Sequence, residues 1–197
     1  QAVLGSALSQ SGSRSSETRL ATWIGFAAGL LADADVFIRS SEDTLLSIEY
    51  HRHFTHSIFF IPFGALIAAL ILWPFIKNKI SFKRLYWFAL LGYSLSGVID
   101  ACTSYGTYLF WPLYDERISF HLIAIVDPVF TLALIVGVVI AYKKRQSRFA
   151  LMGLLFAAAY LSVSFVQLQR AEAVAEQLAI ERGHAPLRSL TKPTIGN

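Results

Sequence analysis

Long apolar stretches alternate with short polar segments along most of the chain. The apolar stretches cover residues 20–37, 58–76, 85–99, 122–142 and 149–166. A helix needs about 17–25 mainly apolar residues to cross a bilayer, so four stretches are long enough. The third must extend past Asp100 or cross a thinned, protein-packed region. The pattern predicts an all-α, polytopic integral membrane bundle with about five transmembrane helices, preceded by a short N-terminal helix.

The pattern changes after residue 166. Residues 167–181 place apolar and charged side chains at helical spacing, which predicts an amphipathic continuation of the last helix. Gly183 is a natural end for that helix. Residues 184–197 contain two prolines and predict an irregular tail. We therefore expect a transmembrane domain over residues 1–166 and an extramembrane segment over residues 167–197.

Composition supports a membrane protein. Of the 197 residues, 55% are hydrophobic and 15% are charged, and the mean hydropathy is +0.52. A soluble domain would be about one quarter charged. The net charge of +4 does not indicate a nucleic-acid partner, because the basic residues lie between the apolar stretches. Cys102 is the single cysteine, which excludes an intrachain disulfide.

Basic residues cluster in three of the polar segments. They precede the first stretch, follow the second and follow the fourth, in this order: Arg14, Arg19; Lys77, Lys79, Lys83, Arg84; Lys143, Lys144, Arg145, Arg148. Five alternating helices would bring all three clusters to one side, which the positive-inside rule makes cytoplasmic. We therefore expect an integral protein of the bacterial inner (plasma) membrane.

Polar residues gather at the opposite ends of the same stretches. Asp33, Asp35 and Asp100 end two of them, and His121 begins another. Residues 51–57 read His-Arg-His-Phe-Thr-His-Ser, immediately before the second stretch. Each such group is costly near hydrocarbon unless it is paired or bound to metal. The sequence therefore predicts one shared site at the extracytoplasmic interface.

Several of these residues could carry chemistry, and each has a plainer explanation. The carboxylates of Asp33 and Asp35 could bind one or two cations, or could simply end a solvated helix. Asp127, predicted about two turns inside the fourth stretch, must be paired, protonated or bound to metal, although Asp127-Pro128 could also be a structural kink. Arg52 could bind an anionic substrate group through its fixed donors, or pair with Glu49.

The histidines divide in the same way. Neutral imidazole binds divalent metals well. His51 and His56 lie five residues apart, so they converge only if a helix starts between them. His53 fits a loop position or a supporting role. For His121, a role as an interfacial aromatic and a role in the site are equally well supported.

Four segments, in order, resemble a known family. Residues 31–35 resemble a P-D-x-D motif, and residues 51–57 an H-R-x-x-T-H-S motif. Residues 99–107 resemble D-x-x-x-x-Y-G-T, and residues 126–130 contain a buried D-P. Their order and spacing resemble the YdjM-type (DUF457) integral-membrane proteins, described as membrane-bound metal-dependent hydrolases.

The resemblance implies a set of site residues. The metal or catalytic set carried over is Asp33, Asp35, His51, His56, Asp100 and Asp127. Three positions depart from the family pattern: Ser96 and Gln1 stand where many relatives have histidine, and Ala32 replaces a proline. Fewer imidazoles could mean fewer metals, a different metal or an inactive relative.

These observations lead to one functional expectation and one alternative. We expect metal-assisted hydrolysis, with one or two zinc or manganese ions lowering the pKa of water and Arg52 holding an anionic group. A site at headgroup depth suggests membrane lipids as partners and a phospholipid or lipid-linked phosphoester as substrate. The alternative is a non-enzymatic metal-binding protein, either an ion-coupled transporter or a scaffold. Transporters bind their ions near the midplane on broken helices, and only Asp127-Pro128 suggests such a helix.

Overall fold

The computed structural model describes residues 1–38, 50–184 and 190–193, and this part of the chain is helical. Its elements are α1 (Ala2–Ser11), α2 (Thr18–Ala32), η1 (Asp33–Phe37), η2 (Phe54–His56), α4 (Ile61–Ile76), α5 (Phe82–Tyr93), α6 (Ser96–Ala101), α7 (Pro128–Lys144) and α8 (Ser147–Glu181). Extended pairing in the described residues is limited to two isolated bridges, Thr103 with Ile123 and Thr107 with Ile118. The all-α prediction is confirmed.

Two of the described helical segments are long and apolar enough to cross a membrane, Thr18–Phe37 and Ser147–Glu181. Ile61–Ile76 is apolar but shorter. Five crossings are therefore not established, and their number stays a prediction. The third predicted stretch is not one helix, because α5 ends at Tyr93 and α6 begins at Ser96.

The fourth stretch begins later than predicted. Residues 122–127 are not helical, and α7 starts at Pro128. Proline disfavours helical geometry in the residue before it and suits the first helical position, where its missing N–H is not needed. Asp127 therefore lies at the helix start, and the prediction that it lies two turns inside a helix is wrong.

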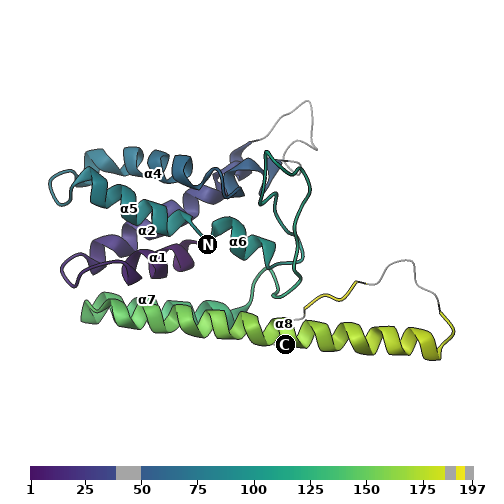
Figure 1. The fold of residues 1–197 in the computed structure, drawn as a ribbon. Helices are drawn as coiled ribbons and strands as arrows, with labels where there is room; N and C mark the ends of the chain where they lie inside the picture. The colour runs from purple at the N-terminus through teal and green to yellow at the C-terminus, as the bar shows by residue number, and fades with distance from the viewer. Residues whose placement is uncertain (39–49, 185–189, 194–197) are drawn as a thin grey trace.

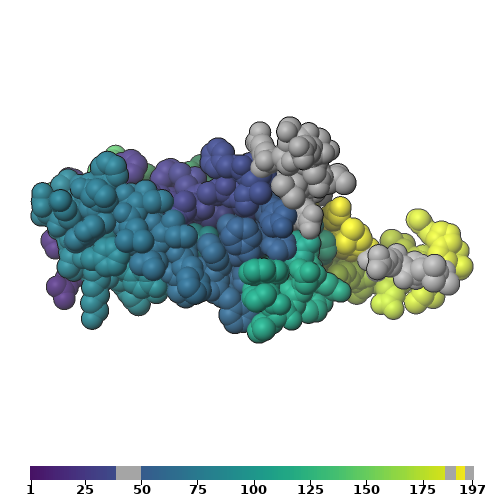
Figure 2. All heavy atoms as spheres, turned by 90° about the horizontal axis from the view of Figure 1, so that it is seen from above, coloured from purple at the N-terminus to yellow at the C-terminus, as the bar shows by residue number. Residues whose placement is uncertain are grey.

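Helix α8 is a single helix of 35 residues that includes the predicted fifth stretch and its amphipathic continuation. At 1.5 Å per residue it is about 52 Å long, which exceeds a hydrocarbon core of about 30 Å. Its C-terminal part extends beyond the helical body (Figures 1 and 2). The predicted division at residue 166 thus falls within one continuous helix.

Two apolar clusters hold the bundle together. The first joins α2, α4 and α5 around buried residues such as Ile24, Phe88 and Tyr93. The second joins α1, α7 and α8 around Leu4 and Leu134, among others. Helix α1 packs on both groups, with α2 and α5 on one side and α7 and α8 on the other (Figure 1).

Three helices meet at backbone distance where α1, α2 and α5 cross. A Cβ atom on Gly5 would lie 2.5 Å from the carbonyl oxygen of Gly25 and 2.6 Å from that of Gly92. Small residues allow such close helix packing. This junction sets the position of α1, whose N-terminus lies close to α6 (Figure 1).

The three loops with basic clusters lie at one end of the bundle. They connect α1 to α2, α4 to α5 and α7 to α8, and Figure 1 shows them together, far from η1 and α6. Arg84 in α5 pairs with Glu17 at the start of α2, with 2.7 Å between Nη2 and Oε2. The structure thus separates the basic end from the end that carries the candidate site.

Candidate metal centre

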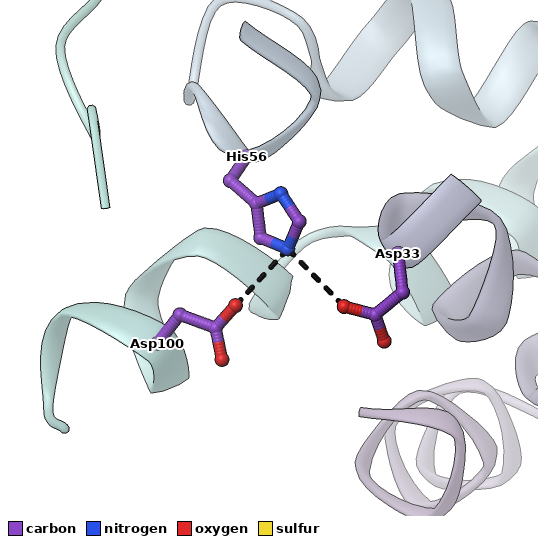
Figure 3. Close-up of side chains that lie close together, drawn as sticks. All are labelled: Asp33, His56 and Asp100. Carbon is purple, nitrogen blue, oxygen red and sulfur yellow. Dashed lines mark ion pairs between the residues drawn. The ribbon is translucent and has the colours of Figure 1, made fainter. Parts of the chain in front are cut away.

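The side chains of Asp33, His56 and Asp100 converge on one another (Figure 3). The Nε2 atom of His56 lies 3.0 Å from Oδ2 of Asp100 and 3.5 Å from Oδ1 of Asp33. One ligand atom from each residue lies within 4.8 Å of the other two. Together these three residues could hold a metal ion.

Each of the three residues comes from a different element. Asp33 begins η1, where the last turn of α2 tightens, His56 ends η2, and Asp100 lies in α6. Helix α6 can approach η2 because it carries Gly97, where any Cβ atom would overlap the backbone oxygen of His56. Asp100 follows Gly97 by one helical turn, so this contact brings its carboxylate to the imidazole.

The second nitrogen of His56 faces a different carboxylate. Its Nδ1 atom lies 3.3 Å from Oδ2 of Asp35 and 3.0 Å from Oγ1 of Thr55. Asp35 is buried and accepts hydrogen bonds from the Arg52 backbone N–H at 2.7 Å and the Thr55 hydroxyl at 2.9 Å. These acceptors favour a proton on Nδ1, which leaves Nε2 available to a cation.

His56 lies between η1 and α4, outside the two segments that could span a membrane. Burial lowers the pKa of its imidazole, but hydrogen bonds to Asp100, Asp33 and Asp35 outweigh burial and raise the pKa to about 10. Without a metal the carboxylates therefore hold a protonated ring. A divalent cation would replace that proton as the positive charge at the centre.

Arg52 lies beside the three residues. Its φ angle of 58° places the backbone in the left-handed region and reverses the chain between His51 and His56. The Nε atom lies 3.1 Å from Oδ2 of Asp100, and Nη1 donates to Thr103 at 3.3 Å. The predicted alternative partner, Glu49, lies outside the described residues.

His51 lies outside the metal-binding group. Its Nδ1 atom is 3.3 Å from Oδ1 of Asp35, and its ring lies against Tyr105. The side chain is 33% exposed. The structure thus places His51 as a partner of Asp35. Neither residue belongs to the group that Asp33 and Asp100 form at Nε2 of His56.

Asp127 also lies outside the group. Its Oδ1 atom accepts a hydrogen bond from the backbone N–H of Phe130 at 2.9 Å, and Oδ2 accepts one from the Tyr160 hydroxyl at 2.8 Å. Both bonds fit a residue that caps α7 and joins it to α8. The carboxylate therefore has structural partners at the position where the sequence predicts a ligand or catalytic group.

The two remaining histidines of this end have other surroundings. The His53 ring packs 4.4 Å from the ring of Tyr108, and its Nε2 atom lies 3.8 Å from Oδ1 of Asp115. His121 has a φ angle of 52° and lies 3.4 Å from the hydroxyl of Ser119. His53 therefore lies in a loop among aromatic side chains, and the roles of both histidines stay predictions.

Three residues of this site were not assigned a role from the sequence. Gln1 reaches His56 from the start of α1, Thr55 bridges Asp35 and His56, and Gly97 permits the approach of α6. The resemblance to the family had already marked position 1, where it implies a histidine in many relatives. Thr55 is the threonine of the H-R-x-x-T-H-S motif, but the motif does not state its role. Gly97 carried no signal of its own, because its role depends on a contact between distant elements.

These observations define the class as an all-helical protein that has two helices long and apolar enough to cross a membrane and a candidate Asp-His-Asp metal centre. The family follows from comparison with known sequences: a model described as YdjM inner membrane protein matches residues 1–171, so the chain belongs to that family. The resemblance drawn from the four motifs is thereby confirmed. No curated protein and no solved structure matches the chain.

Proposed function

We propose that this protein is a membrane-embedded, metal-dependent hydrolase whose centre is formed by Asp33, His56 and Asp100. The observation that carries the proposal is the convergence of two carboxylates and one imidazole nitrogen from three separate elements. Groups this costly to bury rarely gather without a function that needs them.

The donor set fits a divalent cation. Two carboxylate oxygens and one imidazole suit zinc or manganese, and three protein ligands leave room for a substrate, as in catalytic metal sites. The Asp33 side chain is 37% exposed, so the centre can be reached from outside. A bound cation would supply Lewis-acid chemistry, polarising a carbonyl or phosphoryl oxygen and lowering the pKa of water.

The protein's own side chains then have separate tasks. Asp35 holds the Nδ1 proton of His56 and fixes the orientation of the ring. Arg52, whose side chain is only 12% exposed, directs a rigid fork of donors at this centre and would bind an anionic group of the substrate. Tyr105, whose ring centre lies 5.2 Å from the Arg52 guanidinium carbon, supports the guanidinium by a cation–π contact.

An amphiphilic substrate fits the surroundings of the centre. Val36 and Phe37 follow Asp33 and Asp35 in η1, and the Phe37 side chain is 82% exposed. Apolar side chains beside a polar centre would receive the chains of a lipid whose headgroup reaches Asp33. We therefore propose a phospholipid or lipid-linked phosphoester as substrate, and an extracytoplasmic site because the basic loops lie at the other end.

One observation favours a non-enzymatic function. Helix α5 ends at Tyr93 and α6 starts at Ser96, so Asp100 lies on a discontinuous helix. Broken helices are typical of ion-coupled transporters. In a transporter or a scaffold the cation would still bind, but no substrate would be hydrolysed.

Metal analysis combined with turnover separates these functions. We would measure metal content of detergent-purified wild type, Asp100→Asn and Arg52→Ala, and hydrolysis of phospholipid and lipid phosphate in mixed micelles. The hydrolase proposal expects stoichiometric metal in wild type, loss in Asp100→Asn, and retained metal without turnover in Arg52→Ala. Arg52→Ala should not weaken binding, because it removes a positive charge next to Asp100.

The opposing results are equally clear. A wild type that binds no zinc or manganese after reconstitution would overturn the metal centre. Bound metal with no hydrolysis of any lipid phosphoester would favour the scaffold or transporter.

A further inference from the structure

The first residue of the described chain reaches the metal centre from α1. The Nε2 atom of Gln1 lies 3.0 Å from Nε2 of His56 and donates a hydrogen bond to Oδ2 of Asp100. The other end of the amide, Oε1, is buried and has no hydrogen-bond partner among the described residues. Gln10 also has an unsatisfied amide oxygen, but only the amide of Gln1 lies at the candidate metal centre, where it calls for an explanation.

The two ends of this amide can exchange places. The oxygen and nitrogen of a glutamine amide have nearly the same size and shape, so a half-turn of the group swaps them without moving neighbours. The half-turn brings Oε1 to the present position of Nε2, next to His56 and Asp100. With a cation among these groups, the electronegative oxygen is the end that electrostatics favours.

Backbone contacts hold Gln1 at this position. A Cβ atom on Gly29 would lie 3.0 Å from the backbone oxygen of Gln1 and 3.1 Å from Cα of Ala2. Gly29 lies in the last turn of α2, four residues before Asp33, with which η1 begins. The first turn of α1 therefore lies directly against the part of α2 that leads to the centre.

From this geometry we propose that Oε1 of Gln1 is a fourth protein ligand of the metal centre, and that it favours manganese or magnesium relative to zinc. This rests on the proposed metal centre. The ligand set becomes three oxygens and one nitrogen, and oxygen donors suit manganese and magnesium whereas imidazole suits zinc. Zinc still binds more tightly than manganese, as it does at most sites. The ratio of the zinc affinity to the manganese affinity is smaller, however, than it would be with an imidazole at position 1.

The test measures dissociation constants for Mn²⁺ and Zn²⁺ by competition titration of the detergent-purified full chain. Gln1→Leu removes the donor at similar size, and Gln1→His replaces the oxygen by an imidazole. Gln10→Leu is the matched control, because Gln10 is a buried amide of the same helix that bonds to Thr22 and the Val138 carbonyl.

The proposal expects Gln1→Leu to weaken Mn²⁺ binding by at least about tenfold, since even residues behind metal ligands have effects of that size. Gln1→His should raise the preference for zinc over manganese by about tenfold or more, and Gln10→Leu should leave both constants unchanged. The visible spectrum of bound Co²⁺ should change in Gln1→His and not in Gln10→Leu, because only the former changes a ligand.

Two results would overturn the assignment of Gln1. One is a Gln1→Leu protein whose two constants stay within twofold of wild type. The other is equal weakening of both metals with an unchanged ratio in Gln1→His, which would make Gln1 a residue that only positions Asp100. A wild type that binds neither metal would overturn the metal centre itself, so the two failures are distinguishable.

Discussion

The Nδ1 atom of His56 lies 3.3 Å from Oδ2 of Asp35, on the side of the ring away from Asp33 and Asp100. Asp33 and Asp35 are only two residues apart in η1, yet they address different nitrogens of one imidazole. The D-x-D motif therefore does not present two carboxylates to one side of His56. Asp33 is a candidate metal ligand, and Asp35 orients the imidazole of His56, which is another.

Replacing Asp35 should weaken metal binding without removing the ligands. Asp35→Asn keeps the shape of the side chain but loses the negative charge that holds the Nδ1 proton of His56. Metal affinity should fall about 10- to 100-fold, the range typical of a carboxylate behind a ligating histidine. Titration with Zn²⁺ or Mn²⁺ measures the change. Asp33→Asn, which alters a proposed ligand, is the comparison, and equal or smaller loss there would contradict the division of roles.

Gly97 should tolerate no side chain. In Gly97→Ala the new methyl group would overlap the backbone oxygen of His56, so α6 and η2 must separate. Overpacking of this kind destabilises by about 1–3 kcal/mol, and here it also moves Asp100 away from His56. The melting temperature and the metal content should both fall. Gly153→Ala is the control, because its Cβ atom would meet its nearest neighbour at an ordinary 3.4 Å.

Replacing Asp127 should lower the stability of the fold more than it lowers metal binding. Asp127→Ala removes the cap of α7 and the bond from Tyr160, so the free energy of unfolding should fall by about 1–2 kcal/mol. Metal content should remain that of wild type. Tyr160→Phe removes only the second bond and should have a smaller effect. Loss of metal in Asp127→Ala would instead support the ligand role that the sequence predicts for this residue.

The ion pair at the basic end should give a pH-dependent contribution to stability. Arg84 donates to both carboxylate oxygens of Glu17, at 3.1 Å and 2.7 Å, and these bonds hold the Glu17 pKa below its ordinary value of 4.5. A lowered pKa in the folded state stabilises above the unfolded value, and this stabilisation is lost as the pH falls through the folded pKa.

The pair is partly exposed, so it should contribute no more than about 1 kcal/mol. The measurement is the difference in melting temperature between wild type and Glu17→Gln. The difference should be present at pH 7 and disappear in acid well below pH 4.5. Metal binding should be unchanged in Glu17→Gln, because this residue lies at the end of the bundle away from Asp33. A difference that persists in acid would show that the charge of Glu17 is not its cause.

The sequence predicts the helical class and the residues of the centre better than it predicts their arrangement. Apolar periodicity was sufficient for α8, because its signal is continuous over many turns. The break before Ser96 has only a weak local signal, because Gly92, Ser94 and Gly97 are loop-forming residues that also occur inside membrane helices. The late start of α7 had a clearer one, since a proline follows Asp127.

Some site residues could likewise be predicted from the sequence, and others depended on packing between distant elements. Asp33, His56 and Asp100 were among six candidates, because charged and imidazole groups are costly near hydrocarbon unless paired or bound to metal. His51 lies instead against Asp35 and Tyr105, and just after it the backbone of Arg52 is left-handed, a conformation that an arginine does not signal in the sequence. The role of Gln1 depended on how α1 packs, and that is set by glycines in two other helices.

The meeting of Gly5, Gly25 and Gly92 has a consequence for how this protein can evolve. Main chain lies against main chain there, so substitutions on the exposed sides of α2 and α5 leave the junction undisturbed. The scaffold that carries residue 1 to the centre can thus stay constant while residue 1 itself varies. A lineage could exchange its preferred metal by a single codon change, with no need to rebuild the bundle.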